Sequence, residues 1–179
     1  EDDVCLVKGM VACEISTCDE LLATELMFMG VFNDLSPEQA VALCSVLVFT
    51  ERAKEDDRAP LREELAAPFR QLATAARRIA EVKRDAQLEI DVEEYVGQFT
   101  PQMMEVVFEW CKGAKFSEIC QMTDVFEGSI IRCMRRLEEF LRQMASAAKT
   151  IGNTELETKF NEGIERMKRD IVFAASLYL

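Results

Sequence analysis

The longest helical pattern in the chain covers residues 123–149. Its apolar residues recur at intervals of four and three, which is the period of a buried stripe on an α-helix. The stripe consists of Ile130, Met134, Leu137, Leu141, Met144 and Ala148. Glu127 lies in the first turn, where a carboxylate favours the positive end of the helix dipole. The pattern therefore predicts a long helix over about residues 126–150 with one face in the core.

A second line along the same helix is polar at the same period. It consists of Ser129, Arg132, Arg136, Glu139, Gln143 and Ser146. One interpretation is a solvated helix surface on which neighbouring Arg and Glu side chains pair, because charged runs usually face water. The other is a surface that meets phosphate, since residues 131–149 carry five basic and two acidic side chains in a chain of net charge −12. The acidic excess is concentrated in residues 1–60, so only the later part of the chain is expected to approach nucleic acid.

The remaining pattern predicts an all-α fold, a bundle of about seven or eight helices. Helices are expected over residues 17–29, 36–50, 61–87, 91–99, 100–113, 116–122 and from about 153 onward. Ser36 followed by Pro37 marks a helix start, and Pro68 is expected to kink or divide the helix over residues 61–87. Residues 51–60 are charged and turn-like, which predicts an exposed loop.

The two ends of the chain depart from this pattern. Residues 1–16 lack helical periodicity and contain Gly9, which predicts an extended segment that lies across another surface. Residues 17–179 are expected to form one domain, because a chain of 179 residues that is 49% hydrophobic can bury a substantial single core. The tail over residues 171–179 is so apolar that it must pack against the bundle or against another part of a longer protein.

The sequence lacks the residues and motifs that common kinds of catalysis, phosphate binding and metal binding require. Histidine is absent, and with it the commonest general base and every Ser-His-Asp or Cys-His arrangement. The chain has no G-x-x-x-x-G-K-[ST] phosphate loop and no Asp-Glu-x-His box, and its seven cysteines include no C-x-x-C pair. No apolar run reaches the roughly 20 residues of a membrane span. We therefore expect no catalytic, cofactor-binding or metal-binding residue and no membrane partner, and we expect any ATP hydrolysis to occur in sequence upstream of Glu1.

Four stretches resemble a known family. They are ICQMTDVFEGSIIRCMRRLEE with the closing GNTELETKF and RDIVFAASLYL, and the opening KGMVACEISTCDELLATELMFMGVFNDLSPEQAVAL. Together they resemble the C-terminal DSHCT domain of superkiller-like DExH-box RNA helicases, and within that family the nuclear exosome helicases of the Mtr type. The resemblance covers nearly all of the chain. Met10 departs from it, because the family is expected to have a basic residue after Lys8-Gly9.

The resemblance implies a function for the long helix. It would be a ratchet-like helix beneath the RNA channel of an ATP-dependent 3′-to-5′ RNA helicase, in a bundle that closes the path of single-stranded RNA beyond two RecA-like motor domains. Arg136 and Glu139 match the positions of that helix that touch RNA, and helical spacing adds Arg132 and Gln143. The arginines would contact phosphate or sugar, and Glu139 would accept a hydrogen bond from a 2′-hydroxyl or a base edge.

The resemblance also implies partners and a location. ATP and Mg²⁺ would bind in the motor domains of the parent protein. The partners would be single-stranded RNA, the motor and winged-helix domains of the same chain, and the nuclear exosome with its adaptor proteins. The location would be the nucleus and nucleolus.

Two other function classes stay open at this point. A short helix, a turn and a longer basic helix are also the outline of a helix-turn-helix DNA reader. Against that interpretation, the long helix offers few side chains suited to base edges near its N-terminus, where Phe126, Glu127, Gly128 and Ser129 lie. The third class is a protein-interaction scaffold that binds neither nucleic acid.

Overall fold

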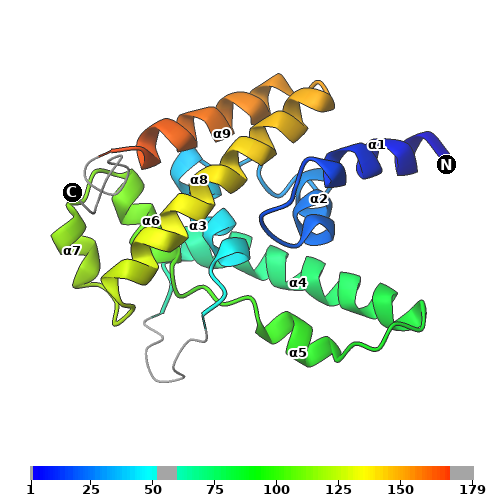
Figure 1. Cartoon of the computed structure of the whole chain (residues 1–179), viewed down its shortest axis with the longest axis horizontal. Helices are drawn as coiled ribbons and strands as arrows, with labels where there is room; N and C mark the ends of the chain where they lie inside the picture. Colours follow the sequence, from blue (N-terminus) through cyan, green and yellow to red (C-terminus); the bar gives the residue numbers. More distant parts are fainter. Residues whose placement is uncertain (1, 52–59, 170–179) are drawn as a thin grey trace.

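The computed structural model describes residues 2–51 and 60–169, and these residues form helices and connections without a strand (Figure 1). The helices are α1 (Asp2–Cys13), α2 (Glu20–Phe28), α3 (Pro37–Val48), α4 (Glu63–Asp85), α5 (Val92–Gly97), α6 (Met104–Cys111), α7 (Phe116–Cys120), α8 (Glu127–Thr150) and α9 (Thr154–Met167). The predicted all-α bundle is confirmed, with one helix more than the upper end of the predicted range. The expected loop over residues 51–60 falls mostly outside the described residues, as does the apolar tail.

Helix α1 corrects the prediction for the start of the chain. Residues 1–16 were expected to be extended, whereas Asp2–Cys13 is helical. Val11 and Ile15 are buried four residues apart, and Val7 lies one turn before them, so an apolar row at helical spacing is present after all. Gly9 lies in open space and weakens the helix by only about 1 kcal/mol relative to alanine. Contacts with α2 and with α8 outweigh that cost.

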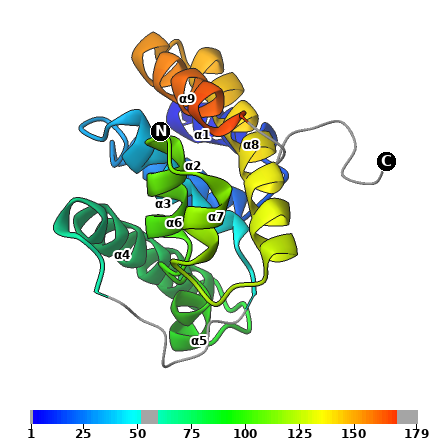
Figure 2. The ribbon, with the colours of Figure 1, turned by 90° about the vertical axis from the view of Figure 1, so that its left-hand side faces the viewer.

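Helix α3 is the element that the others surround. All nine residues from Ala40 to Val48 are buried, which is the composition of a helix that is apolar on every side. Viewed from the side (Figure 2), α8 and α9 lie on one side of α3, and α4 with α5 lies on the other. Its start is the predicted one: Ser36 Oγ accepts a hydrogen bond from the Gln39 backbone N–H at 3.2 Å, and Gln39 Oε1 accepts one from the Ser36 N–H at 2.8 Å.

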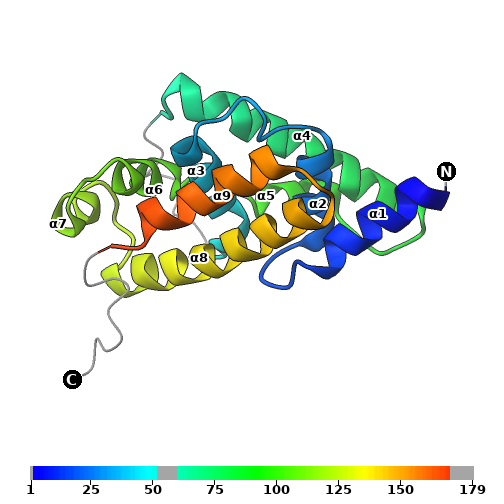
Figure 3. The ribbon, with the colours of Figure 1, turned by 90° about the horizontal axis from the view of Figure 1, so that it is seen from above.

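Helices α8 and α9 pack side by side as a pair (Figure 3). All six residues of the predicted α8 stripe are fully buried, and Cys133, Phe140 and Ala147 widen the buried face. Gly152 joins the two helices at a φ of 73°, a left-handed conformation that glycine adopts without strain. Asn153 then caps α9 by accepting a hydrogen bond from the Leu156 N–H at 3.1 Å.

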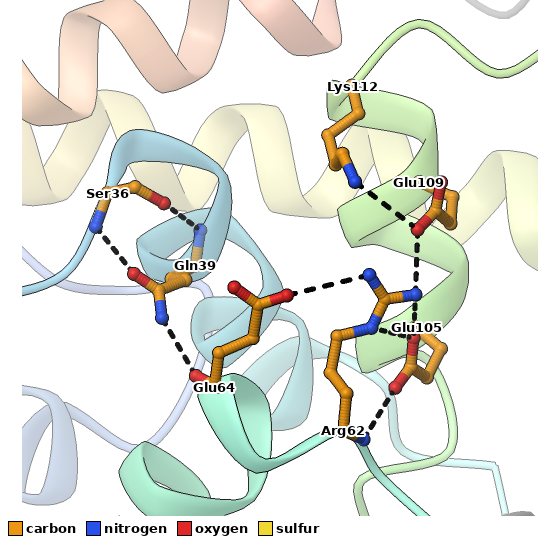
Figure 4. Close-up of polar contacts among 7 residues, drawn as sticks. All are labelled: Ser36, Gln39, Arg62, Glu64, Glu105, Glu109 and Lys112. Atoms are coloured by element: carbon orange, nitrogen blue, oxygen red, sulfur yellow. Dashed lines mark hydrogen bonds and ion pairs between the residues drawn. The ribbon is translucent and has the colours of Figure 1, made fainter.

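Helix α4 continues through Pro68, where a kink or a division was expected. Proline removes the N–H that would bond the carbonyl four residues earlier, here that of Glu64. The Gln39 side chain replaces it, because Gln39 Nε2 donates to the Glu64 carbonyl at 2.8 Å (Figure 4). A contact between α3 and α4 therefore satisfies the acceptor that the proline leaves free.

The beginning of α4 is fastened to α6 by one arginine (Figure 4). Arg62 Nε donates to Glu105 Oε2 at 2.8 Å and Nη2 donates to Glu109 Oε1 at 2.7 Å, while the Arg62 backbone N–H donates to Glu105 Oε1 at 3.0 Å. The guanidinium also lies over the Phe108 ring, 4.7 Å from its centroid. These contacts hold the start of α4 against α6, although α5 lies between the two helices in sequence.

Helices α9 and α3 approach each other closely at Gly163. A Cβ built on Gly163 would lie 2.6 Å from Val41 Cγ2, a distance that real contacts do not show. Val41 is fully buried and β-branched, so its methyl group has no other rotamer available without disturbing the core. Glycine at position 163 is therefore a packing requirement of the α3–α9 crossing.

We predict that Gly163→Ala destabilises the fold by about 1 to 3 kcal/mol through overpacking, although alanine is the better helix former. In a Val41→Ala background, which removes the clashing methyl group, Gly163→Ala should be neutral or stabilising. Gly9→Ala in α1, where a Cβ meets nothing within 4 Å, is the matched control and should stabilise by up to about 1 kcal/mol. Chemical denaturation of the four variants measures these free energies. An unchanged cost of Gly163→Ala in both backgrounds would contradict the proposed clash.

Candidate nucleic-acid interface

The predicted polar line of α8 is exposed along only part of its length. Arg132, Arg136 and Glu139 are exposed, Gln143 is half-buried, and Ser129 is buried. Ser129 Oγ accepts a hydrogen bond from Arg132 Nη2 at 2.9 Å, so this serine supports an arginine from below and does not itself reach the surface. The exposed part of this polar line therefore begins at Arg132.

The ion pair between Arg132 and Glu51 is weak. Its Nη2 lies 3.4 Å from Glu51 Oε1, and the two side chains are 66% and 51% exposed. An ion pair this exposed contributes little to stability and can exchange for another anion at small cost. Arg132 can therefore turn toward a phosphate without loss of fold.

Arg136 is held by a neutral group. Its Nη2 donates to the Thr17 carbonyl at 3.1 Å, and it makes no ion pair with any described residue. A guanidinium has five donors, so the bond to Thr17 orients the side chain and leaves its charge and most of its donors for an anion. The side chain also borders a pocket of about 240 Å³. The other residues lining the pocket are Cys18, Asp19, Val46, Leu47, Phe49, Thr50, Gln98 and Phe99.

Glu139 lies one turn after Arg136 on the same side of the helix. Within the described residues it accepts no hydrogen bond and forms no ion pair, so the expected pairing with Arg136 is not seen. Its carboxylate is exposed to water. Arg136 and Glu139 thus present a donor and an acceptor about one helical turn apart.

Gln143 has a structural role that sequence reasoning missed. Its Oε1 accepts hydrogen bonds from the backbone N–H groups of Ser16 at 3.0 Å and Thr17 at 3.2 Å, and its Nε2 donates to Ser16 Oγ at 3.0 Å. The amide therefore fastens the connection between α1 and α2 onto α8. An RNA contact by Gln143 stays a prediction, and it would have to compete with these three bonds.

The same connection also contacts the polar line beyond Gln143. Ser146 Oγ donates to Glu14 Oε2 at 3.0 Å, and Thr150 Oγ1 donates to Glu14 Oε1 at 3.5 Å. Residues 14–17 thus lie along the second half of α8, beside α1, and bring a carboxylate there (Figure 3). The Glu14 carboxylate disfavours an anionic ligand beside the second half of the helix.

The site carries no arrangement typical of catalysis. Burial raises the pKa of the Cys133 thiol to about 12, and burial together with the neighbouring Asp19 carboxylate raises that of Cys18 to about 12. Thiols kept neutral in this way are poor nucleophiles and poor metal ligands. Within residues 2–51 and 60–169 no three Cys, Asp or Glu side chains gather as a metal site would need. None of the described helices combines the length and apolar character of a membrane span.

The helix-turn-helix alternative finds little support in the geometry. Helix α7 has five residues, and the first turn of α8 presents Phe126 and Glu127 to solvent while Ser129 is buried. A recognition helix reads base edges with donors and acceptors near its N-terminus. The exposed cations of α8 begin more than a turn later, at Arg132.

We predict that Gln143→Ala destabilises the fold by about 1 to 2 kcal/mol, because two backbone donors and one hydroxyl lose their partner. Arg136→Ala and Glu139→Ala should each change the free energy of unfolding by no more than about 0.5 kcal/mol, since both side chains are at the surface. Leu137→Ala, from the buried face, should cost about 2 to 5 kcal/mol. Urea denaturation of the four variants checks this order. Equal values for Gln143→Ala and Glu139→Ala would remove the structural role given to Gln143.

The sequence matches a known domain family over nearly its whole length. The family model described as DSHCT (NUC185) domain matches residues 2–174. The chain is 64% identical over 177 residues to the protein named Exosome RNA helicase MTR4 in Mus musculus and in Homo sapiens, and 56% identical over 178 residues to ATP-dependent RNA helicase mtr4 of Schizosaccharomyces pombe. Each match covers 99% of this chain but only 17% of the mouse and human proteins and 16% of the yeast protein. The chain thus spans about a sixth of the length of these relatives, and it belongs to the DSHCT domain family.

Proposed function

We propose that this chain is the C-terminal module of an ATP-dependent 3′-to-5′ RNA helicase and guides single-stranded RNA from the motor domains toward the nuclear exosome. The family match over residues 2–174 is the observation that carries the proposal, since the relatives at 64% and 56% identity are named as RNA helicases. The module would act by contact with RNA, while the chemistry of ATP hydrolysis belongs to other parts of the longer protein.

The geometry of α8 supports an RNA-contacting role. Its inner face is fully buried in the core, so the helix is a rigid support for the side chains on its outer face. Arg132 and Arg136 would contact phosphate or sugar, and Glu139 would accept a hydrogen bond from a 2′-hydroxyl or a base edge. Because Arg136 is oriented by a carbonyl and not by a carboxylate, its charge is available to the strand.

The charge distribution suggests how tightly the module holds RNA. A few exposed cations release few counterions, and the net charge of −12 repels a strand elsewhere on the surface. The chain alone should therefore bind RNA weakly and with a shallow salt dependence. Weak contact suits a surface along which a strand must move, because each phosphate has to be released as the next one arrives.

The proposal implies partners beyond this chain. ATP and Mg²⁺ would bind in the motor domains of the longer protein, because the present sequence contains no phosphate loop and the described residues gather no metal ligands. The motor and winged-helix domains would form the other walls of the RNA path. The exosome and its adaptor proteins would be partners of the whole protein, which would act in the nucleus and nucleolus.

We predict that Arg136→Ala combined with Glu139→Ala, in the full-length protein, slows or uncouples RNA unwinding while ATP turnover persists. The physical reason is that both changes remove contacts to the strand and leave the motor domains untouched. Strand displacement and ATP turnover on the same preparation provide the measurement.

Arg142→Ala is the matched control for this experiment. Arg142 is another exposed arginine of α8, but it pairs with Glu138 and lies on a different side of the helix from Arg136. Its loss should leave unwinding unchanged. Normal unwinding by the double variant would mean that the polar line is only a solvated helix surface. Loss of unwinding in both the double variant and Arg142→Ala would indicate general damage to α8.

A further inference from the structure

An exposed aromatic ring stands at the start of α8. Phe126, the residue before the helix, is 73% exposed, the largest value among the large apolar side chains of the described residues. The next phenylalanine in that group, Phe28, is 37% exposed. Phenylalanine normally buries most of its surface, so a ring left this open is informative.

The ring is held in place from below. A Cβ built on Gly128 would lie 2.7 Å from Phe126 Cε1 and 3.2 Å from Cδ1, so the ring lies directly over the Gly128 backbone. The same point is 3.6 Å from Arg132 Nη1, which places the guanidinium beside the ring. Gly128 does not have a left-handed backbone conformation. Glycine is needed there because a Cβ would occupy the space that the Phe126 ring fills. One edge of Phe126 rests on the helix, and the rest of it faces solvent.

Phe126 continues the line of the proposed RNA contacts. It precedes Arg132 by six residues and Arg136 by ten, and its ring lies beside the Arg132 guanidinium over Gly128. Ten residues of α-helix span roughly 15 Å. In the other direction along α8, residues 14–17 are hydrogen-bonded to Gln143 and Ser146 and bring the Glu14 carboxylate there, which disfavours phosphate. A strand that touches Arg136 is therefore favoured to run toward the Phe126 end of the helix.

We propose that Phe126 is a stacking platform for one base of single-stranded RNA and that Arg132 contacts the adjoining phosphate. This inference rests on the proposed function and adds a residue of a different kind to it. An aromatic face next to a cation is the usual pairing in single-strand binding, because every base has a π-face and every nucleotide a phosphate. Asp124 and Glu127 flank the ring in sequence and disfavour phosphate there, which leaves the uncharged base as the part of a nucleotide that fits.

The competing occupant is an apolar surface of a protein, since Met122 is also exposed nearby in sequence. An RNA base and an apolar protein surface need different properties of the side chain at position 126. Base stacking needs a flat aromatic ring, whereas an apolar contact needs only buried hydrocarbon. Phe126→Leu keeps the apolar surface and removes the ring, and Phe126→Trp keeps and enlarges the ring.

The experiment uses the full-length protein and a short single-stranded oligouridine that carries one photoreactive 5-bromouracil. For the wild type, we expect a crosslink in the peptide that contains Phe126. We expect Phe126→Leu to weaken binding of the unmodified oligonucleotide about fivefold or more, from the cost of one lost stack, and Phe126→Trp to restore it. Phe28→Leu, on α2, is the matched control and should leave affinity unchanged. Thermal unfolding of each variant checks that the fold persists.

The outcomes separate the two proposals. If Arg136→Ala weakens RNA binding while Phe126→Leu binds normally and no crosslink falls near Phe126, the platform is refuted and the proposed function stands. If Phe126→Leu and Phe126→Trp both bind RNA normally but Phe126→Asp disrupts assembly of the protein with its partners, the ring is a protein contact and the platform is again refuted. If neither Arg136 nor Phe126 affects RNA binding by a protein that does bind RNA, both proposals fail.

Discussion

The burial of α3 on all sides is the constraint on which the rest of the structure depends. A helix that is apolar all round is stable only when other elements cover every face, and α4, α6, α8 and α9 do so here. The crossing of α9 over α3 is close enough to require Gly163 against Val41. Because α9 packs along α8, this contact also sets which side of the long helix faces outward. The position of the exposed arginines is therefore a consequence of core packing.

One face of the long helix packs in the core and the other faces outward. The two halves of the outward face have different surroundings. The inner face is buried from Ile130 to Ala148. On the outer face, the first half carries exposed cations, whereas the second half is taken up by residues 14–17 through Gln143 and Ser146. A chain segment far away in sequence thus sets the length of the surface that a ligand can use.

The charge distribution of the domain favours weak binding of an anionic ligand. The chain carries a net charge of −12, and Arg132 and Arg136 are exposed cations in the first half of α8. The net negative charge repels an anionic ligand, and the small number of cations that would contact it limits the affinity.

The sequence by itself determined the features that depend on local periodicity and capping. The buried stripe of α8 and the Ser36 start of α3 were both predicted from residues within a few positions of each other. The location of Arg136 and Glu139 at the surface followed from the same period.

Only the tertiary structure decided the features that depend on partners distant in sequence. Gly9 made the first residues look extended, yet packing against α2 and α8 keeps them helical. Pro68 is accommodated inside α4 by a side chain 29 residues earlier, since Gln39 bonds the carbonyl of Glu64. Gln143 bonds backbone groups 127 and 126 residues away. Periodicity reports which side of a helix is apolar, but it holds no information about which distant polar groups will meet there, because those contacts exist only once the core has brought the helices together.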